Sequence, residues 1–303
     1  MESNSNRKDG LAILLAFITV VFWSSGFVFT RLAVRYFSPF SLGLLRYGTA
    51  TVVVVAIGLC KRIGLPKAKD IPLFLLMGAL GFTFYMILFN QAMLTISAAT
   101  GSILGATVPV MTALFSAWFF KERISVVGWF SIAVNFVGIL ILTLWHGTFS
   151  LESGLVLMIA AAVSFAAYNL MQRFATKNYT PLQATVYSIV SGTLLLMVFL
   201  PQLLEELSTA PLEGILDGIY MGIFPSAIGF ILWAKALSYA SHMNTVTNFM
   251  FVTPLLSTIL EYIMTKEVPD TGTILGGTII LVGLILFSYR SRIGTLLAHR
   301  KNT

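Results

Sequence analysis

The chain has 303 residues, of which 57% are hydrophobic and only 10% are Asp, Glu, Lys or Arg. Soluble domains carry roughly 25% charged residues, so this composition excludes a soluble globular protein. The net charge of +7 does not indicate nucleic-acid binding, because most Lys and Arg residues lie between long apolar stretches on one predicted side of a membrane.

The apolar stretches are long enough to cross a membrane. Eight of them contain no Asp, Glu, Lys or Arg, and residues 71–120 suffice for two crossings, since a spanning helix needs about 20 apolar residues. Residues 36–60 add one more and are interrupted only by Arg46. We therefore predict an all-α integral membrane protein with ten transmembrane helices, over residues 11–34, 38–60, 71–93, 98–120, 125–145, 153–174, 180–203, 214–237, 243–265 and 271–289.

The Lys and Arg residues predict the orientation of these spans. With a cytoplasmic N-terminus and ten alternating spans, 15 of the 19 Lys and Arg residues fall on the cytoplasmic side. Cytoplasmic loops of membrane proteins carry this excess. We therefore expect both termini in the cytoplasm, a lipid bilayer as the surrounding medium, and no nucleic-acid partner.

The second half of the chain repeats landmarks of the first half. The pairs, with their separations, are Pro39 and Pro181 (142 residues), Gly78 and Gly222 (144), Pro109 and Pro254 (145), and Lys121–Glu122 and Lys266–Glu267 (145). A unit of five spans is odd, so the second copy enters the membrane from the opposite side, as in many secondary transporters. We predict two inverted five-helix repeats, over residues 1–148 and 149–303, the second with a cytoplasmic tail.

Several short motifs resemble a known family. They are "FWSSGFVFTR" (22–31), "NQAMLTISAATGSILGATVPV" (90–110), "FKERIS" (120–125), "WAKALSYASHMNTV" (233–246), "TP" (253–254) and "TKE" (265–267). In order and spacing they resemble the EamA unit of the drug/metabolite transporter superfamily. The resemblance implies a ten-helix inner (plasma) membrane carrier, in most members an exporter of amino acids or other small metabolites. It also implies a cavity lined by spans 1, 3, 4, 6, 8 and 9.

Two prolines interrupt spans four and nine. A proline inside a helix removes a hydrogen bond and clashes with the carbonyl four residues earlier. Freed backbone groups in a membrane are satisfied by neighbours or line a wet cavity. We expect Pro109 and Pro254 to bend these spans around a central site; the alternative is a kink without function. Glu122 and Glu267, which end the two spans, are interpreted as structural first and gating second.

Polar and aromatic residues in the cavity-candidate spans predict the substrate site. Aromatic rings combine apolar area with a polar handle, although Trp and Tyr also mark membrane interfaces. The candidate substrate-binding residues are Trp23, Ser24, Tyr85, Asn90, Gln91, Thr107, Tyr168, Asn169, Gln172, Trp233, Lys235 and Asn248.

Two charged residues near the spans have two interpretations each. Charges near a bilayer centre are costly and usually face a cavity or a partner. Lys235 either contacts substrate or extends its ammonium to the cytoplasmic surface. Glu261 either binds a coupling proton or pairs with Lys266 or Arg46.

These features predict a secondary carrier that exports a small neutral or zwitterionic metabolite, such as an amino acid, by alternating access. Multidrug transport and sugar-phosphate or nucleotide-type transport are the alternatives, and a channel is a further one. Paired acids or an activated nucleophile within the bilayer are missing from the sequence, so an enzyme is not expected. The three histidines have no metal-ligand spacing. We expect no metal and no cofactor, and a single chain suffices for alternating access.

Overall fold

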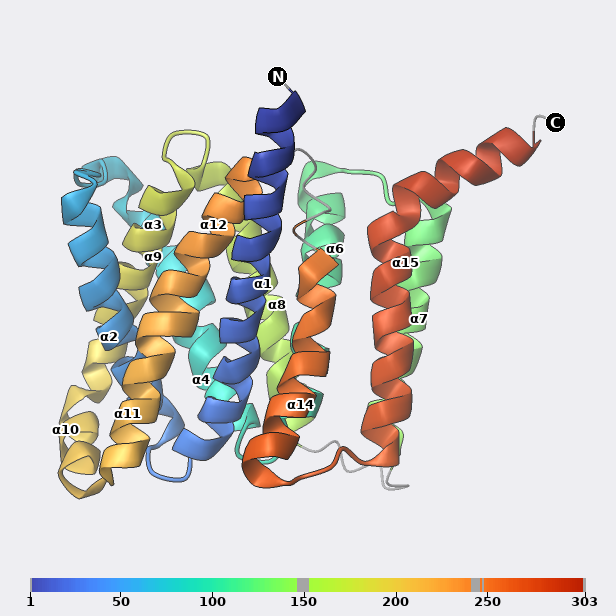
Figure 1. The fold of residues 1–303 in the computed structure, drawn as a ribbon. Coiled ribbons are helices and arrows are strands. Elements are labelled where there is room, and N and C mark those ends of the chain that lie inside the picture. The colour runs from blue at the N-terminus through green and yellow to red at the C-terminus, as the bar shows by residue number, and fades with distance from the viewer. Residues whose placement is uncertain (1, 146–152, 241–245, 247, 302–303) are drawn as a thin grey trace.

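The structure is a computed structural model that describes residues 2–145, 153–240, 246 and 248–301, and all the regular elements in these ranges are helical. The helices run side by side through one bundle, and both chain termini lie at the same end (Figure 1). We call this the upper end, as in Figure 1, and the opposite end the lower end. The predicted boundary between residues 148 and 149 lies outside the described residues.

The first five spans follow the predicted order. Their elements are α1 (Glu2–Ala33), α2 (Pro39–Cys60), the short η1 (Ala68–Asp70), α3 (Ile71–Gly78), the π-helical η2 (Ala79–Phe84), α4 (Tyr85–Ala92), α5 (Ala98–Gly105), α6 (Val108–Phe120) and α7 (Val126–Leu144). Span three is thus α3, η2 and α4 in one line, and span four is α5 followed by α6.

The second five spans have the same plan. Their elements are α8 (Ser153–Ala175), α9 (Pro181–Leu196), η3 (Met197–Phe199), α10 (Leu200–Thr209), α11 (Leu212–Met221), the π-helical η4 (Gly222–Ile228), α12 (Gly229–Tyr239), η5 (Asn248–Val252), α14 (Thr253–Thr265) and α15 (Thr271–Lys301). Span seven continues through α10 and is longer than predicted. Span eight is α11, η4 and α12, and the described part of span nine is η5 and α14.

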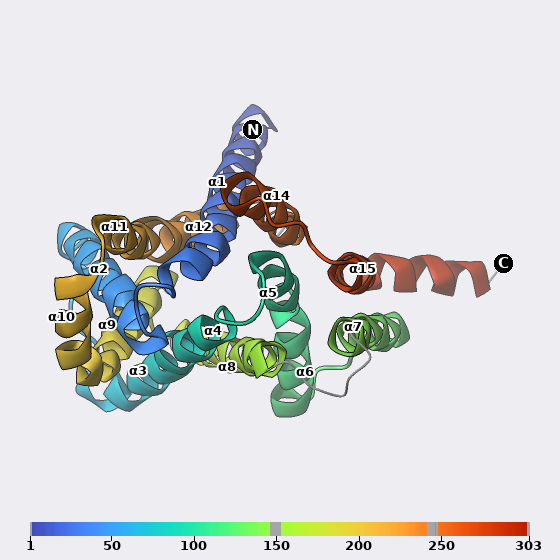
Figure 2. The ribbon, with the colours of Figure 1, turned by 90° about the horizontal axis from the view of Figure 1, so that it is seen from below.

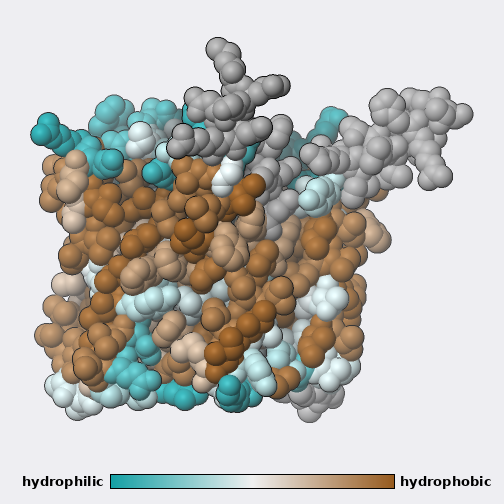
Figure 3. Space-filling view, viewed as in Figure 1, coloured by the Kyte–Doolittle hydropathy of each residue, from teal (hydrophilic) through white to brown (hydrophobic). Residues whose placement is uncertain are grey.

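The helices meet the requirements of a bilayer. Within the described residues, eight are long and apolar enough to cross a membrane, and two shorter apolar helices cover Val126–Leu142 and Phe249–Thr265. Hydrophobic residues cover most of the middle of the face drawn in Figure 3, and hydrophilic ones gather at its upper and lower edges. A helix satisfies its own backbone groups, which is what the hydrocarbon interior demands. The predicted all-α, ten-span membrane fold is confirmed.

The inverted repeat extends to unusual backbone geometry. The π-helical segment η2 begins directly after Gly78, and η4 begins at Gly222. These two glycines are 144 residues apart. Spans four and nine each end in a left-handed lysine, with φ of 55° at Lys121 and 61° at Lys266. Such φ values are uncommon outside glycine. Because the π-helical segment and the left-handed lysine recur at matching positions, the two halves have the same backbone plan.

Spans four and nine are each interrupted just before a proline. Thr107 and Val252, which precede the new helices α6 and α14, have nearly the same backbone angles (φ −78°, ψ −11° and φ −79°, ψ −21°). Pro109 and Pro254 each occupy the first turn of the new helix. Proline is tolerated there because the N–H it lacks has no partner within the helix. The interruption expected at each proline thus takes the form of a new helix whose first turn contains the proline.

The second span of each repeat starts with the same device. Ser38 caps α2 by accepting a hydrogen bond from the N–H of Ser41, and Thr180 caps α9 by accepting one from Gln183. Pro39 and Pro181 follow as the first helical residues. Capping side chains satisfy N–H groups that the first turn leaves without a partner. These prolines therefore begin helices without interrupting a span.

Spans five and ten form a separate pair. Helices α7 and α15 pack against each other at one edge of the bundle, seen from below in Figure 2. Gly138 of α7 lies so close to α15 that a Cβ atom there would stand 2.6 Å from Ile280 and 2.8 Å from the Gly276 carbonyl. Small residues allow this approach between membrane helices.

We expect Gly138→Ala to lower the thermal stability of the purified protein. The added methyl group has no space between α7 and α15, and overpacking costs about 1–3 kcal/mol. Gly48→Ala is the matched control, since a Cβ there meets no atom within 4 Å. Thermal unfolding in detergent measures both variants, and equal melting temperatures would contradict the packing argument.

Candidate functional site

Four predicted site residues meet in one cluster of aromatic rings. The aromatic cluster comprises Trp23, Phe82, Tyr85, Phe165, Tyr168, Phe230 and Trp233. Its ring centroids are 4.8 to 6.4 Å apart, a range in which aromatic pairs attract each other. Spans one and three supply three of the rings, and spans six and eight supply four. The cluster therefore lies where the two repeats meet.

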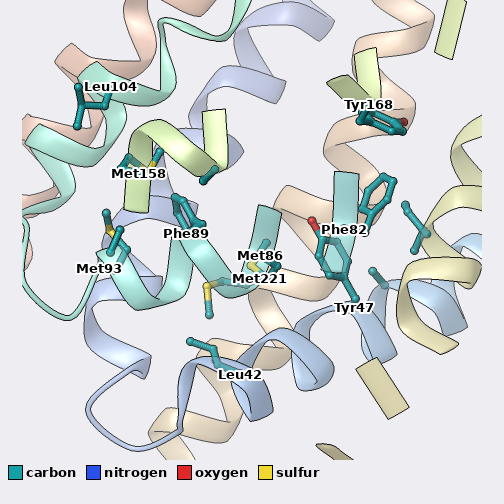
Figure 4. Packing of buried hydrophobic residues seen from close by; sticks show 14 of the residues in the cluster. Leu42, Tyr47, Phe82, Met86, Phe89, Met93, Leu104, Met158, Tyr168 and Met221 are labelled. Carbon is teal, nitrogen blue, oxygen red and sulfur yellow. The ribbon is translucent and has the colours of Figure 1, made fainter. Parts of the chain in front are cut away.

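The cluster is tied to the π-helical segments. Trp23 donates a hydrogen bond from Nε1 to the Pro225 carbonyl in η4, at 3.1 Å. Phe82 lies in η2 and packs edge-on to Tyr168 and to Tyr47, and Figure 4 shows Tyr168, Phe82 and Tyr47 in succession. Single π-helical turns within α-helices often occur at functional sites, because they alter which side chains face inward. Here both π segments border the same cluster.

Ser24 connects two helices. It is fully buried, and its hydroxyl donates to the Val20 carbonyl at 2.7 Å and lies 3.2 Å from the Thr253 carbonyl at the start of α14. In return, Ser257 of α14 donates to the Ser24 carbonyl at 3.2 Å. These bonds link α1 of the first repeat to α14 of the second. In this conformation Ser24 therefore contacts helices rather than an open site.

Asn90 and Thr107 are buried, and each donates a hydrogen bond to a backbone carbonyl of the first repeat. Asn90 donates from Nδ2 to the Pro39 carbonyl at 2.8 Å, while its Oδ1 has no hydrogen-bond partner among the described residues. Thr107 donates to the Leu104 carbonyl at 2.6 Å, just before the break in span four. Gln91 is half-buried beside Asn90. All three lie in the first repeat, from spans three and four.

The remaining polar candidates lie toward the upper end. Asn169 is half-buried on α8 and approaches Thr112 at 3.4 Å, and Gln172 is half-buried one turn later. Lys235 is exposed on α12, with its ammonium 5.6 Å from the Tyr239 ring centre. Asn248 begins η5, and its side chain lies outside the described residues. The structure thus gathers the aromatic candidates but distributes the polar ones.

Glu261 forms neither of the expected ion pairs. Its carboxylate, on a side chain only 2% exposed, accepts hydrogen bonds from the backbone N–H groups of Ala98 at 2.6 Å and Ala99 at 2.9 Å. Those residues begin α5, and a carboxylate is favoured at a helix N-terminus by the helix dipole. The pairing with Lys266 or Arg46, one of the two interpretations, is wrong, because the carboxylate accepts hydrogen bonds at the N-terminus of α5 instead. Glu261 thereby ties span nine to span four at the lower end.

A cavity of about 250 Å³ lies beside this tie at the lower end. Polar and acidic side chains dominate its wall; the residues with carboxylates are Glu261, Glu267 and Asp270. Glu267 is exposed, and its N–H donates to the Thr265 hydroxyl at 3.2 Å. Thr100 and Thr273 join α5 to α15 across the same region through their hydroxyls at 3.0 Å. The lower ends of both repeats are thus held together.

Glu122 connects spans four and six at the upper end. Its carboxylate accepts a hydrogen bond from Arg173 at 2.9 Å, in an ion pair whose two side chains are each half exposed. The Arg173 guanidinium also lies 4.4 Å from the centre of the Phe120 ring. Exposed ion pairs contribute little stability, about 0–1 kcal/mol. Glu122 thus fixes the geometry of the span end more than it stabilises the fold.

Arg46 borders the aromatic cluster, although it is not among the predicted substrate-binding residues. It is 8% exposed and donates from Nε to the hydroxyl of Ser226 in η4 at 2.7 Å. The sequence signal was visible as the charge that interrupts span two. Its partner was not, because Ser226 lies 180 residues later in the chain.

The geometry defines a class: a multi-pass helical membrane protein with two inverted repeats and an aromatic cluster between them. The model of the EamA-like transporter family matches residues 10–144 and 152–289. The chain therefore belongs to the EamA-like transporter family, within the drug/metabolite transporter superfamily, and it is a membrane transporter rather than an enzyme.

Individual relatives align with this chain over almost their full length. The "Uncharacterized transporter YdfC" of Bacillus subtilis is 30% identical over 285 residues, covering 93% of this chain and 92% of the relative. The "Probable terminal-alkyne amino-acid exporter" of Streptantibioticus cattleyicolor is 27% identical over 286 residues, covering 94% and 95%. A solved crystal structure at 20% identity has a TM-score of 0.61 and covers 93% of this chain and 98% of that one, which supports the fold.

Proposed function

We propose that this transporter is a secondary carrier that exports a small neutral or zwitterionic metabolite, such as an amino acid, by alternating access. The observation that carries the proposal is the aromatic cluster between the two repeats, bordered by both π-helical segments. Secondary carriers with inverted repeats bind substrate at such an interface, beside interrupted helices. The amino-acid class is supported by the name of the Streptantibioticus relative.

The residues take different parts in this proposal. The rings of Trp23, Tyr85, Tyr168 and Trp233 contact the apolar part of the substrate, because aromatic faces offer large apolar area with a polar handle. The polar residues assigned to binding or to its approach are Asn90, Gln91, Thr107, Asn169, Gln172, Lys235 and Asn248, and Ser24 belongs to the contact of α1 with α14. The repeats, proposed as residues 1–148 and 149–303, rock against each other.

The breaks at Pro109 and Pro254 and the tie at Glu261 support rocking. A lower-end opening has to separate α14 from α5, so the hydrogen bonds from Ala98 and Ala99 to Glu261 must break. Protonation of Glu261 would remove acceptor capacity and weaken this tie. Proton coupling through Glu261 therefore remains part of the proposal, with Glu122 and Glu267 as gating residues at opposite ends.

One observation disfavours the sugar-phosphate alternative. Multiply charged phosphates need several cationic groups, yet Lys235 is exposed, and Arg46 is the buried cation that borders the cluster among the described residues.

An export screen tests the proposed function. Cells with and without the protein are loaded with isotope-labelled amino acids, and mass spectrometry follows their release. We expect faster release of at least one neutral amino acid in cells that carry the protein. Equal release of all of them, with the protein present in the membrane, would refute amino-acid export.

We also propose that the upper end, with both termini, faces the cytoplasm. Cys60 is the only cysteine in the sequence and is exposed at the upper end of α2. A membrane-impermeant maleimide should therefore leave intact cells unlabelled and label Cys60 in inside-out vesicles. The matched control combines Cys60→Ala with Ser208→Cys at the lower end, where Ser208 is exposed, and should label in the reverse order. The opposite pattern would reverse the orientation.

A further inference from the structure

Within the part of the chain that the structure describes, Arg46 is a buried cation without an acidic partner. Its side chain is 8% exposed, and its bonds go to the Ser226 hydroxyl at 2.7 Å and, from Nη1, to the Met86 sulfur at 3.9 Å. Among the described residues, no carboxylate forms a salt bridge with it, whereas Arg173 has Glu122. A guanidinium carries five N–H donors, and a thioether is a weak acceptor. Most of its hydrogen-bonding capacity is thus available to an anion.

The guanidinium points toward the middle of the bundle. Arg46 lies seven residues into α2, and its partner Ser226 lies fourteen residues after the start of α11 and thirteen before the end of α12. At 1.5 Å per residue, Ser226 is roughly 21 Å from one end of its span and 20 Å from the other. An arginine without a role in the membrane interior extends its guanidinium toward the nearer membrane surface. Arg46 extends in the opposite direction.

Elements of both repeats surround this guanidinium. Met86 comes from α4 and Ser226 from η4, and a Cβ added to Gly26 of α1 would lie 3.8 Å from Nη2. Arg46 also lies over the ring of Tyr47, 5.9 Å from its centre. Tyr47 packs on Phe82 at 5.2 Å, so Arg46 borders the aromatic cluster. One charged group and one apolar surface are therefore adjacent at the interface of the repeats.

We propose that Arg46 binds the carboxylate of the transported substrate. The guanidinium fork matches a carboxylate in two parallel hydrogen bonds, and the apolar part of the substrate then lies on the aromatic cluster. This deepens the proposed function, on which it rests. It narrows the substrate class to small carboxylic acids with an apolar or aromatic group, including neutral amino acids, and excludes amines without a carboxylate.

The test compares acids with their amides. Binding of L-phenylalanine, L-phenylalaninamide, phenylacetate and phenylacetamide is measured on protein in lipid nanodiscs, through tryptophan fluorescence and thermal stabilisation. Wild-type protein should bind each acid at least about tenfold more tightly than its amide, as expected for a charge-assisted pair. Arg46→Gln should remove this preference. Ser226→Ala, which leaves the charge in place, should keep it.

The outcomes are separable. If Arg46→Gln does not fold, Arg46→Lys replaces it and should weaken the preference, because an ammonium lacks the planar fork. Equal binding of acid and amide by the wild type, no binding of any probe, or an unchanged preference in the folded Arg46 variant would overturn the inference. Failure of amino-acid flux together with Arg46-dependent binding of phenylacetate would refute amino-acid export and still support the anchor. Flux with an unchanged acid preference in Arg46→Gln would refute the anchor alone.

Discussion

Glu261→Ala is expected to destabilise the protein by about 2 kcal/mol or more, as measured by thermal or denaturant unfolding in detergent. The substitution removes the acceptor for the N–H groups of Ala98 and Ala99, both of which are fully buried. A buried donor without a partner costs about 1–3 kcal/mol. Loss of a helix cap costs about 0.5–2 kcal/mol by comparison. Glu261→Gln keeps one acceptor oxygen and should lose roughly half as much.

Glu267→Ala is the matched control for this prediction. Glu267 lines the same cavity, but it is exposed, so its removal should change stability by less than about 0.5 kcal/mol. If Glu261→Ala and Glu267→Ala unfold at the same temperature as the wild type, Glu261 does not tie the repeats together.

Flux at several pH values in Glu261→Gln addresses proton coupling, which predicts that this variant no longer responds to a pH gradient.

Pro109→Ala and Pro254→Ala are expected to slow transport about tenfold each, with little change in insertion or stability. A tenfold rate change corresponds to about 1.4 kcal/mol in the barrier. Each proline occupies the first turn after a break in its span, so alanine fits the fold. Alanine also restores an N–H that can join the two helices, which makes the hinge stiffer. Residues that absorb backbone changes control the rate of such motions.

Pro39→Ala and Pro181→Ala are matched controls for the two hinge variants. They form a second pair of repeat-related prolines, but they begin whole spans, at the first helical residues of α2 and α9. Their transport rates should stay near that of the wild type. Equal rates for all four variants, normalised to the amount in the membrane, would show that the breaks in spans four and nine are not hinges.

The number of spans and their inverted arrangement could be predicted from the sequence. Uncharged stretches are long and separated by basic loops, and the landmarks at Pro109 and Pro254 recur in register. The bilayer requires long uncharged stretches, and the repeat places the same landmarks in both halves, so both features can be seen in the sequence. The π-helical segments η2 and η4 were not predicted, because one extra residue per turn leaves hydropathy unchanged. The matching glycines, Gly78 and Gly222, were the available signal.

The site was predictable by residue type but not by arrangement. The rings of Trp23 and Trp233 were identifiable, yet their contact at 5.0 Å joins spans one and eight. Glu261 could not be matched to its partners, because they are backbone N–H groups and leave no side-chain pattern in the sequence. Ser24 was predicted to bind substrate, but its hydrogen bond to α14 could not be foreseen from the sequence. Contacts between distant spans are set by packing, which local patterns do not record.

Counterflow in proteoliposomes tests most directly whether the two repeats alternate around the aromatic cluster. Vesicles with purified protein are preloaded with an unlabelled neutral amino acid taken from the export screen, and uptake of the labelled form is followed. Alternating access predicts uptake that saturates and that is faster in preloaded vesicles than in empty ones. Uptake that rises linearly with concentration and ignores preloading would contradict alternating access.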